Sequence, residues 1–216
     1  MKRILILSVL LVVFAASCKK DQGDPSTTHT VSYPTITLTG AQYYSIAVNG
    51  ALPTITATAY DTFYSEVCPV LLDLSTLDNT TPGLYAVTAS SKNKYGMTSY
   101  KTVYVGVTNE PSTLDISGVY WRLATSTCVA NISKVATGMF LTDNVGGVEI
   151  GTQAGSVVSA VFVVTSDTTL DFGSQLTSAG TLTASSETLS LPPPTTLNYA
   201  LNLSGFGTSV STFVKQ

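Results

Sequence analysis

The sequence is poor in the residue types that most catalytic and nucleic-acid sites require. Its 216 residues hold one histidine, His29, three cysteines and only 11% charged residues. A Ser-His or Cys-His pair needs a histidine in the folded part, and zinc needs three or four Cys, His or carboxylate ligands at suitable spacing. With 13 acidic against 10 basic residues, the chain also lacks a basic surface for a phosphate backbone. These shortages argue against catalysis, a metal or other cofactor, and a nucleic-acid partner.

The carboxylates do not change this expectation. Asp167 and Asp171 are the nearest pair on a strand and turn, but four residues of strand span about 13 Å, beyond the ~5–10 Å that glycoside hydrolysis uses. Asp143 to Gly147 reads as a hairpin turn and not as a calcium or phosphate loop. We therefore expect a protein that is not an enzyme.

The N-terminus, in contrast, carries a clear export signal. Two basic residues, Lys2 and Arg3, precede an apolar run from Ile4 to Ala16. The run is too short for a bilayer-spanning helix, which needs ~20 apolar residues, and it fits a secretory signal peptide over 1–17. Without these residues, eight basic residues face thirteen acidic ones, a net charge of −5.

The end of this segment resembles a bacterial lipobox. It reads Ala15-Ala16-Ser17-Cys18, small residues followed by cysteine. The resemblance implies that Cys18 receives a diacylglyceryl group and becomes the first residue after cleavage. Two or three acyl chains give stable anchoring, since each buried methylene contributes ~0.8 kcal/mol.

Residues 18–30 lack apolar side chains after the cysteine and predict a flexible tether. Lys19-Lys20-Asp21 resembles the sorting signal that sends lipoproteins of glycan-degrading anaerobes to the outer face of the outer membrane. The expected location is the outer membrane, lipid-anchored and exposed at the cell surface.

From Val31 onward the pattern is all-β. Short stretches alternate with period two between Gly, Pro, Asn and Ser punctuation, and no amphipathic helix stands out. Alternation stops at residues 109–113, where Pro111 removes a ladder donor. We predict one domain over 31–108, a linker over 109–113 and a second domain over 114–216.

Residues 31–108 resemble the bacterial immunoglobulin-like repeats of surface proteins. The likeness rests on Thr81-Pro82-Gly83-Leu84-Tyr85, a polar hairpin around Gly96, and the closing run Val103 to Val107. It implies a β-sandwich without the antibody disulfide, whose stability comes from sheet-on-sheet burial. The inward residues are expected to be Tyr85, Val87, Ala89, Val103, Val105 and Val107.

Residues 114–216 contain seven or eight short strands in succession, with no room for crossover helices. This predicts an antiparallel meander that forms a barrel or a sandwich, and we favour the barrel. Gly118-Val119-Tyr120-Trp121 resembles the Gly-x-Trp entry strand of lipocalin-like domains, but Tyr120 holds the tryptophan position. Ligand binding therefore does not transfer from that resemblance.

Two covalent features stay open. Once Cys18 is acylated, Cys68 and Cys128 are the remaining thiols of an exported protein, and they form either an interdomain disulfide or two small buried thiols. Asp167-Thr168-Thr169 resembles the O-glycosylation sequon of the same bacterial group, which would place a glycan on Thr168; a plain turn threonine is the alternative.

Binding is the remaining function class, and aromatic side chains are its candidates because sugars stack on flat rings. If Val103, Val105 and Val107 face inward, Tyr100 and Tyr104 share the outer face and could form a sugar platform. They could equally be cross-strand partners or dock against the second domain. Trp121 is a third ligand candidate, although sharing a face with Val119 and Leu123 favours a core position.

As a whole, the chain resembles two-domain surface lipoproteins of unknown function from glycan-degrading gut anaerobes. This implies a non-catalytic surface protein that binds glycan or assists a polysaccharide-uptake complex. The alternative is a structural or assembly accessory, in which the immunoglobulin-like domain is a spacer and the C-terminal domain binds a protein partner.

Overall fold

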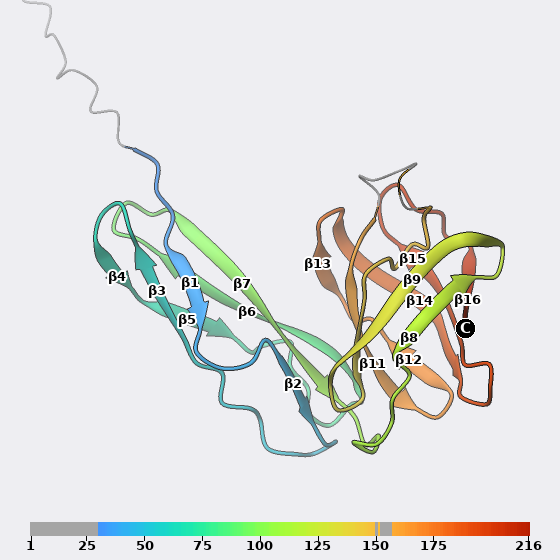
Figure 1. Ribbon diagram of the computed structural model, residues 1–216. Helices are drawn as coiled ribbons and strands as arrows, with labels where there is room; N and C mark the ends of the chain where they lie inside the picture. Colours follow the sequence, from blue (N-terminus) through green and yellow to red (C-terminus); the bar gives the residue numbers. More distant parts are fainter. Residues whose placement is uncertain (1–29, 150, 152–156) are drawn as a thin grey trace, which may run out of the picture. The chain divides into compact units, whose positions relative to one another are not determined.

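The computed structural model describes residues 30–149, 151 and 157–216, of which 32–216 form one compact unit. These described residues form strands and no helix, as the alternation predicted (Figure 1). None of their segments is a helix of the length and apolarity that a membrane crossing requires.

Residues 32–107 form two small sheets. The first has the order β1-β3-β4, with β1 Thr35–Leu38, β3 Ala57–Asp61 and β4 Glu66–Cys68. The second has the order β2-β7-β6-β5, with β2 Tyr43–Ile46, β5 Val70–Asp73, β6 Gly83–Lys92 and β7 Thr98–Val107. All pairings are antiparallel except that of β2 with β7.

The two sheets share their core. One cluster joins Ile36, Ala59 and Cys68 of the first sheet to Ala89 of β6, and another gathers Ile55 with alternate residues of β6 and β7. The predicted inward positions are buried: Val87, Ala89, Val103, Val105 and Val107. Tyr85 is half-buried and packs against the second cluster.

The second half of the chain is an eight-stranded antiparallel barrel with one additional strand. Its order is β12-β11-β10-β9-β8-β16-β15-β14, a pairing of Thr169 with Thr188 closes the ring from β12 to β14, and β13 extends from β14. The alternative of a sandwich is thus excluded. The strands are β8 Gly118–Arg122, β9 Thr125–Ala136, β10 Met139–Thr142, β11 Ala160–Ser166, β12 Thr169–Asp171, β13 Gln175–Thr177, β14 Gly180–Ser190, β15 Thr196–Asn202 and β16 Val210–Lys215.

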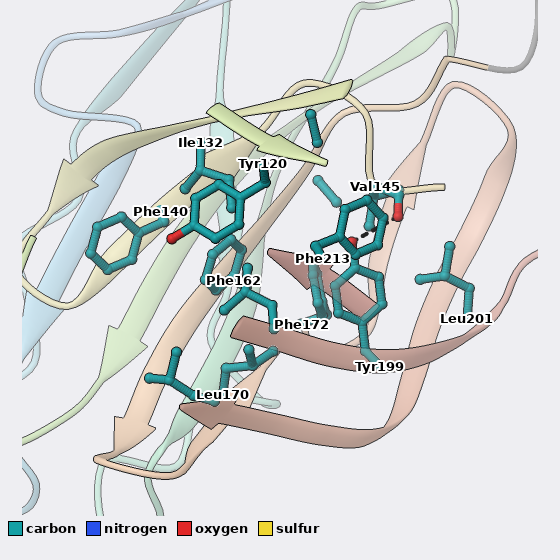
Figure 2. Packing of buried hydrophobic residues seen from close by; sticks show 14 of the residues in the cluster. Tyr120, Ile132, Phe140, Val145, Phe162, Leu170, Phe172, Tyr199, Leu201 and Phe213 are labelled. Carbon is teal, nitrogen blue, oxygen red and sulfur yellow. Dashed lines mark hydrogen bonds between the residues drawn. The ribbon is translucent and has the colours of Figure 1, made fainter. Parts of the chain in front are cut away.

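Aromatic side chains fill the barrel. Successive ring contacts, with centroids 4.7–5.7 Å apart, run through Phe140, Phe162, Phe172, Tyr199 and Phe213 (Figure 2). Their packing is that of a protein core and not of an open ligand cavity. Tyr120, also fully buried, donates its hydroxyl to the Ile116 carbonyl at 2.6 Å.

A further apolar cluster joins β6 and β7 to the barrel. Leu84 and Tyr104 pack with Met139, Val161 and Val163. Gly106 makes this approach possible, because a Cβ there would lie 2.6 Å from the Met139 Cγ. Asp171 and Thr108 add polar links, since the Asp171 carboxylate accepts from the Leu84 N–H at 2.7 Å and the Thr108 hydroxyl donates to the Val164 carbonyl at 2.6 Å.

Candidate functional site

The candidate site is a pocket at the end of the barrel where β8 finishes. It has a volume of about 260 Å³. Arg122 closes β8, while the other walls come from the connections after β10 and β15 and from the start of β16. The lining residues are Arg122, Gly146, Val148, Leu201, Gly205, Phe206, Gly207, Ser209 and Ser211.

The connection after β10 is held by one buried amide. The Asn144 Nδ2 donates to the carbonyls of Val129 and Val148, both at 2.8 Å, and its Oδ1 accepts from the Val148 N–H at 3.1 Å. The hydroxyl of Tyr199 donates to the Val145 carbonyl at 2.8 Å from inside the barrel. A turn is present here, with the Gly147 N–H donating to the Asn144 carbonyl at 3.0 Å, but it is not the expected hairpin turn because the next described strand, β11, begins only at Ala160. These bonds make the segment a rigid wall.

Two adjacent glycines shape this wall. A Cβ on Gly146 would collide with the Phe206 ring, so the ring can lie directly against the backbone only because residue 146 is glycine. Gly147 has φ +53°, and a Cβ there would meet Phe213 at 2.7 Å and the Arg122 Cδ at 3.1 Å. Glycine adopts this left-handed conformation without a steric cost. The Gly146-Gly147 pair thus brings Phe206 and Arg122 together.

Arg122 carries the electrostatics of the pocket. Strand alternation puts it on the same face as the buried Tyr120, so its stem points toward the barrel end. Its Nε is buried and has no hydrogen-bond partner among the described residues. Burial raises the pKa of the neighbouring Tyr199, while the Arg122 charge acts in the opposite direction. A buried donor left unpaired costs roughly 1–3 kcal/mol, so an acceptor from outside is the expected complement.

A second hollow of about 220 Å³ adjoins the pocket and shares Arg122 and Ser211 with it. The two together offer a planar cation, hydroxyl groups and one aromatic face. A guanidinium binds planar carboxylate or other anionic oxygens in a bidentate manner, and an aromatic ring stacks on the C–H face of a sugar. The described lining residues include no carboxylate, histidine or thiol, so the set is suited to binding.

The predicted tyrosine platform does not form. Tyr100 is 71% exposed, but Tyr104 is only 8% exposed, stacks on Tyr43 with ring centroids 6.0 Å apart and packs with Met139. The expectation that Tyr104 faces solvent is wrong because the outer face of β7 is covered at this end by the barrel strands. This packing corresponds to the alternative of docking against the second domain.

The position expected for Trp121 is also reversed. Trp121 is 41% exposed and Leu123 is 72% exposed, whereas Tyr120, the residue before Trp121, is fully buried. The core preference was wrong because Tyr120, and not the larger indole, occupies the inward phase of β8. Trp121 instead pairs with Val129 and Val214 on neighbouring strands and forms part of an outward apolar stripe.

The two folded-part cysteines are free and buried, so the disulfide alternative is corrected. Cys68 belongs to the core shared by the first two sheets, and Cys128 lies on β9 of the barrel. Burial raises the pKa of the Cys68 thiol, with the nearby Glu66 adding to this effect. Cys68 and Cys128 are therefore two small buried thiols, which was the alternative to a disulfide.

The remaining sequence candidates are placed as follows. Cys18 lies outside the described residues. Thr168 is exposed in the turn between β11 and β12. Asp171 accepts from the backbone N–H groups of Leu84 and Gly173, which is a structural role. No cluster of three or more His, Cys, Asp or Glu side chains suited to a metal ion occurs in the described ranges.

Arg122 and Phe206 were not among the sequence candidates. Arg122 shares its face with Tyr120, so its inward position follows only once the structure shows that Tyr120, and not Trp121, faces the core. Phe206 is a single aromatic residue between two glycines, Gly205 and Gly207. A lone ring in a glycine-rich loop has little local sequence to pack against.

Comparisons with known proteins add little to this picture. No protein-family model matches the chain, and no curated protein matches it. Among solved structures, the crystal structure of the lipoprotein BT2262 from Bacteroides thetaiotaomicron aligns over 85% of this chain and 100% of that one, with 19% identity and a TM-score of 0.35. A similarity this low carries no argument, so the function is argued from the site itself.

Proposed function

We propose that this chain is a non-catalytic surface protein, anchored to the outer membrane through lipid on Cys18, that binds glycan at the end of its barrel. The observation that carries the proposal is the Arg122 pocket, where an arginine whose buried Nε has no hydrogen-bond partner among the described residues lines one cavity with the Phe206 ring. Such a pair fits a sugar that bears a carboxylate. The lipobox pattern at Ala15 to Cys18 supports the anchor.

An immunoglobulin-like domain over 31–108 and a linker over 109–113 complete the proposal. The immunoglobulin-like assignment is supported by a tyrosine corner. Near the start of β6, the Tyr85 hydroxyl donates to the carbonyl of Thr81, four residues upstream, at 2.9 Å. This arrangement is a hallmark of immunoglobulin-like sandwiches. The domain then acts as a spacer between the tether and the barrel.

Affinity electrophoresis of the mature chain with Cys18→Ser tests the binding role. Gels containing a uronate-rich polysaccharide should retard the protein, and gels with a neutral glucan should retard it less. Arg122→Gln and Phe206→Ser should abolish the retardation, whereas Tyr100→Ser, which alters the surviving exposed member of the predicted platform, should not. If Tyr100→Ser alone abolishes the retardation, the glycan site lies on β7 and not at Arg122.

The second candidate function is that of an assembly accessory. The observation favouring it is the outward stripe of Val119, Trp121 and Leu123 on β8, because exposed adjoining apolar side chains often mark protein contacts. It predicts that Trp121→Ser abolishes co-purification with an outer-membrane complex while polysaccharide binding stays unchanged. No retardation by any polysaccharide, together with such a partner, would favour this function.

A further inference from the structure

An exposed aromatic cluster lies where two turns meet at one end of the first two sheets. The β3–β4 turn supplies Phe63 and Tyr64, and the β6–β7 turn supplies Lys94 and Tyr95. Ring centroids lie 4.9 Å apart for Phe63–Tyr64 and 4.4 Å for Tyr64–Tyr95. The Lys94 Nζ lies 5.2 and 5.3 Å from the two tyrosine rings. We call these four residues the aromatic tip.

The tip is rigid because one buried polar pair builds both turns. The Asp61 carboxylate, fully buried, accepts from the N–H groups of Phe63 and Tyr64 and from the Asn93 Nδ2 at 2.7 Å. The Asn93 Oδ1 accepts from the N–H groups of Tyr95 and Met97 at 3.0 Å. Nevertheless Phe63 is 59% and Tyr95 45% exposed. A firm frame that presents rings to solvent has the character of a contact surface.

The tether enters the fold at this same place. The Ser32 hydroxyl donates to Asp61 at 2.7 Å, and its carbonyl accepts from the Asn93 Nδ2 at 2.9 Å. Thirteen residues separate Ser32 from Cys18. A chain of this length can reach at most about 45 Å. A lipid on Cys18 therefore keeps the tip within reach of the headgroups.

The distribution of basic residues also favours the membrane as the partner of the aromatic tip. Lys92 and Lys94 lie at the end of the β6–β7 hairpin, where Lys94 also pairs with Glu66 at 3.6 Å, and Lys101 lies further along β7. Lys19 and Lys20 follow Cys18 in the sequence. Together these lysines are five of the eight basic residues in a mature chain of net charge −5. Anionic lipid attracts lysine side chains, and tyrosine and other aromatic rings favour the headgroup region.

From this placement we propose that the aromatic tip lies in the membrane interface, with Phe63 and Tyr95 among the lipid headgroups. The inference rests on the lipid anchor of the proposed function, but it does not depend on glycan binding. It makes the tip a second, weaker attachment that fixes the direction of β6 and β7. Ten residues of β7 then carry the chain about 33 Å away from the tip to Val107.

Vesicle co-sedimentation of the mature, unlipidated Cys18→Ser chain tests the proposal directly. Vesicles of phosphatidylethanolamine and phosphatidylglycerol should bind the chain, and 0.5 M salt should weaken the binding by screening. Phe63→Ser with Tyr95→Ser should weaken it roughly tenfold through lost apolar burial. Lys92→Glu, a change at an exposed position, should also weaken the binding, and it serves as the test if the double variant does not fold. Leu176→Ser, which replaces an even more exposed apolar side chain on β13, is the matched control.

A fluorescence reporter gives the geometry. Phe63→Trp in a Trp121→Phe background should be quenched by brominated lipid, whereas Trp121 in the otherwise unchanged chain should not be. The proposal is overturned if vesicles do not bind, if Leu176→Ser weakens binding as much as the tip variants, or if the tip variants lose polysaccharide binding instead. Mass spectrometry of the membrane-extracted protein tests the anchor separately. An unacylated Cys18 would refute the lipid anchor, whereas vesicle binding of the unlipidated chain tests the tip contact.

Discussion

Replacing Arg122 with methionine should leave the barrel at least as stable while removing its ligand binding. The Nε of Arg122 is buried without a partner among the described residues, and a donor in this state costs about 1–3 kcal/mol. Methionine keeps an unbranched stem beside Gly147 and has no donor to satisfy. We therefore expect the free energy of unfolding to rise by about 1 kcal/mol, or by about 2–4 °C in Tm for a unit of this size.

Lys134 is the matched control because it is the paired counterpart of Arg122. Its ammonium donates to the carbonyls of Ser112 and Leu114, both at 2.6 Å. Lys134→Met breaks two charge-assisted bonds at a half-buried site and should destabilise the protein by about 1–3 kcal/mol. The two substitutions thus change stability in opposite directions although each removes one positive charge.

Urea unfolding followed by circular dichroism measures both variants. If Arg122→Met loses as much stability as Lys134→Met, Arg122 is a structural residue and the argument for a ligand pocket fails. If Arg122→Met is neutral or stabilising but polysaccharide retardation persists, the pocket is excluded as the glycan site. Only retained stability with lost retardation agrees with the proposal.

Three further predictions follow from buried groups. Burial raises the pKa of Asp61, but the hydrogen bonds from Asn93, Ser32 and the turn N–H groups outweigh this effect and lower the pKa. The ionised Asp61 therefore stabilises the fold above the unfolded pKa of about 3.9. This stabilisation is lost as the pH falls through the lower folded pKa. The stability difference between wild type and Asp61→Asn should shrink below about pH 4, and a constant difference would contradict this. In the Cys18→Ser chain, Cys68 and Cys128 should react with a thiol reagent only after unfolding, and fewer than two reactive thiols would indicate a disulfide. Tyr199→Phe, which leaves the Val145 carbonyl unpaired, should cost about 1–2 kcal/mol by urea unfolding; no loss would mean that the wall of the pocket does not depend on this bond.

Sequence alone was enough for the all-β class and the inward residues of β6 and β7, and it favoured the barrel over a sandwich without deciding between them. Period-two alternation is a local property, and Val87, Val103 and Val105 follow it because one face of each strand packs on the opposite sheet. The meander followed from the short spacing between strands in 114–216. These features can be predicted because they depend on residues that are close together in the sequence.

The errors arose where burial depends on distant segments. Tyr104 has the alternation of an outward residue, but Tyr43 stacks on it, and Met139 and Val163, which approach across Gly106, complete its burial. For Trp121 the period was right but the phase was not, because adjacent Tyr120 and Trp121 are both apolar enough for the core. Nothing local decides which of two neighbouring aromatic residues faces inward.

Both proposed contact sites are exceptions to the packing of the rest of the chain, and this makes them separable from the fold. Arg122 brings a charge to the end of an otherwise aromatic barrel core, and Phe63 and Tyr95 present rings to water from turns that Asp61 and Asn93 already hold. A residue that stabilises the fold should cost stability when it is replaced. A residue that stays unpaired or exposed until a partner arrives should cost binding instead. Arg122→Met and Phe63→Ser are therefore expected to change different partners' affinities, glycan in one case and lipid in the other, while neither variant loses stability relative to the unchanged protein.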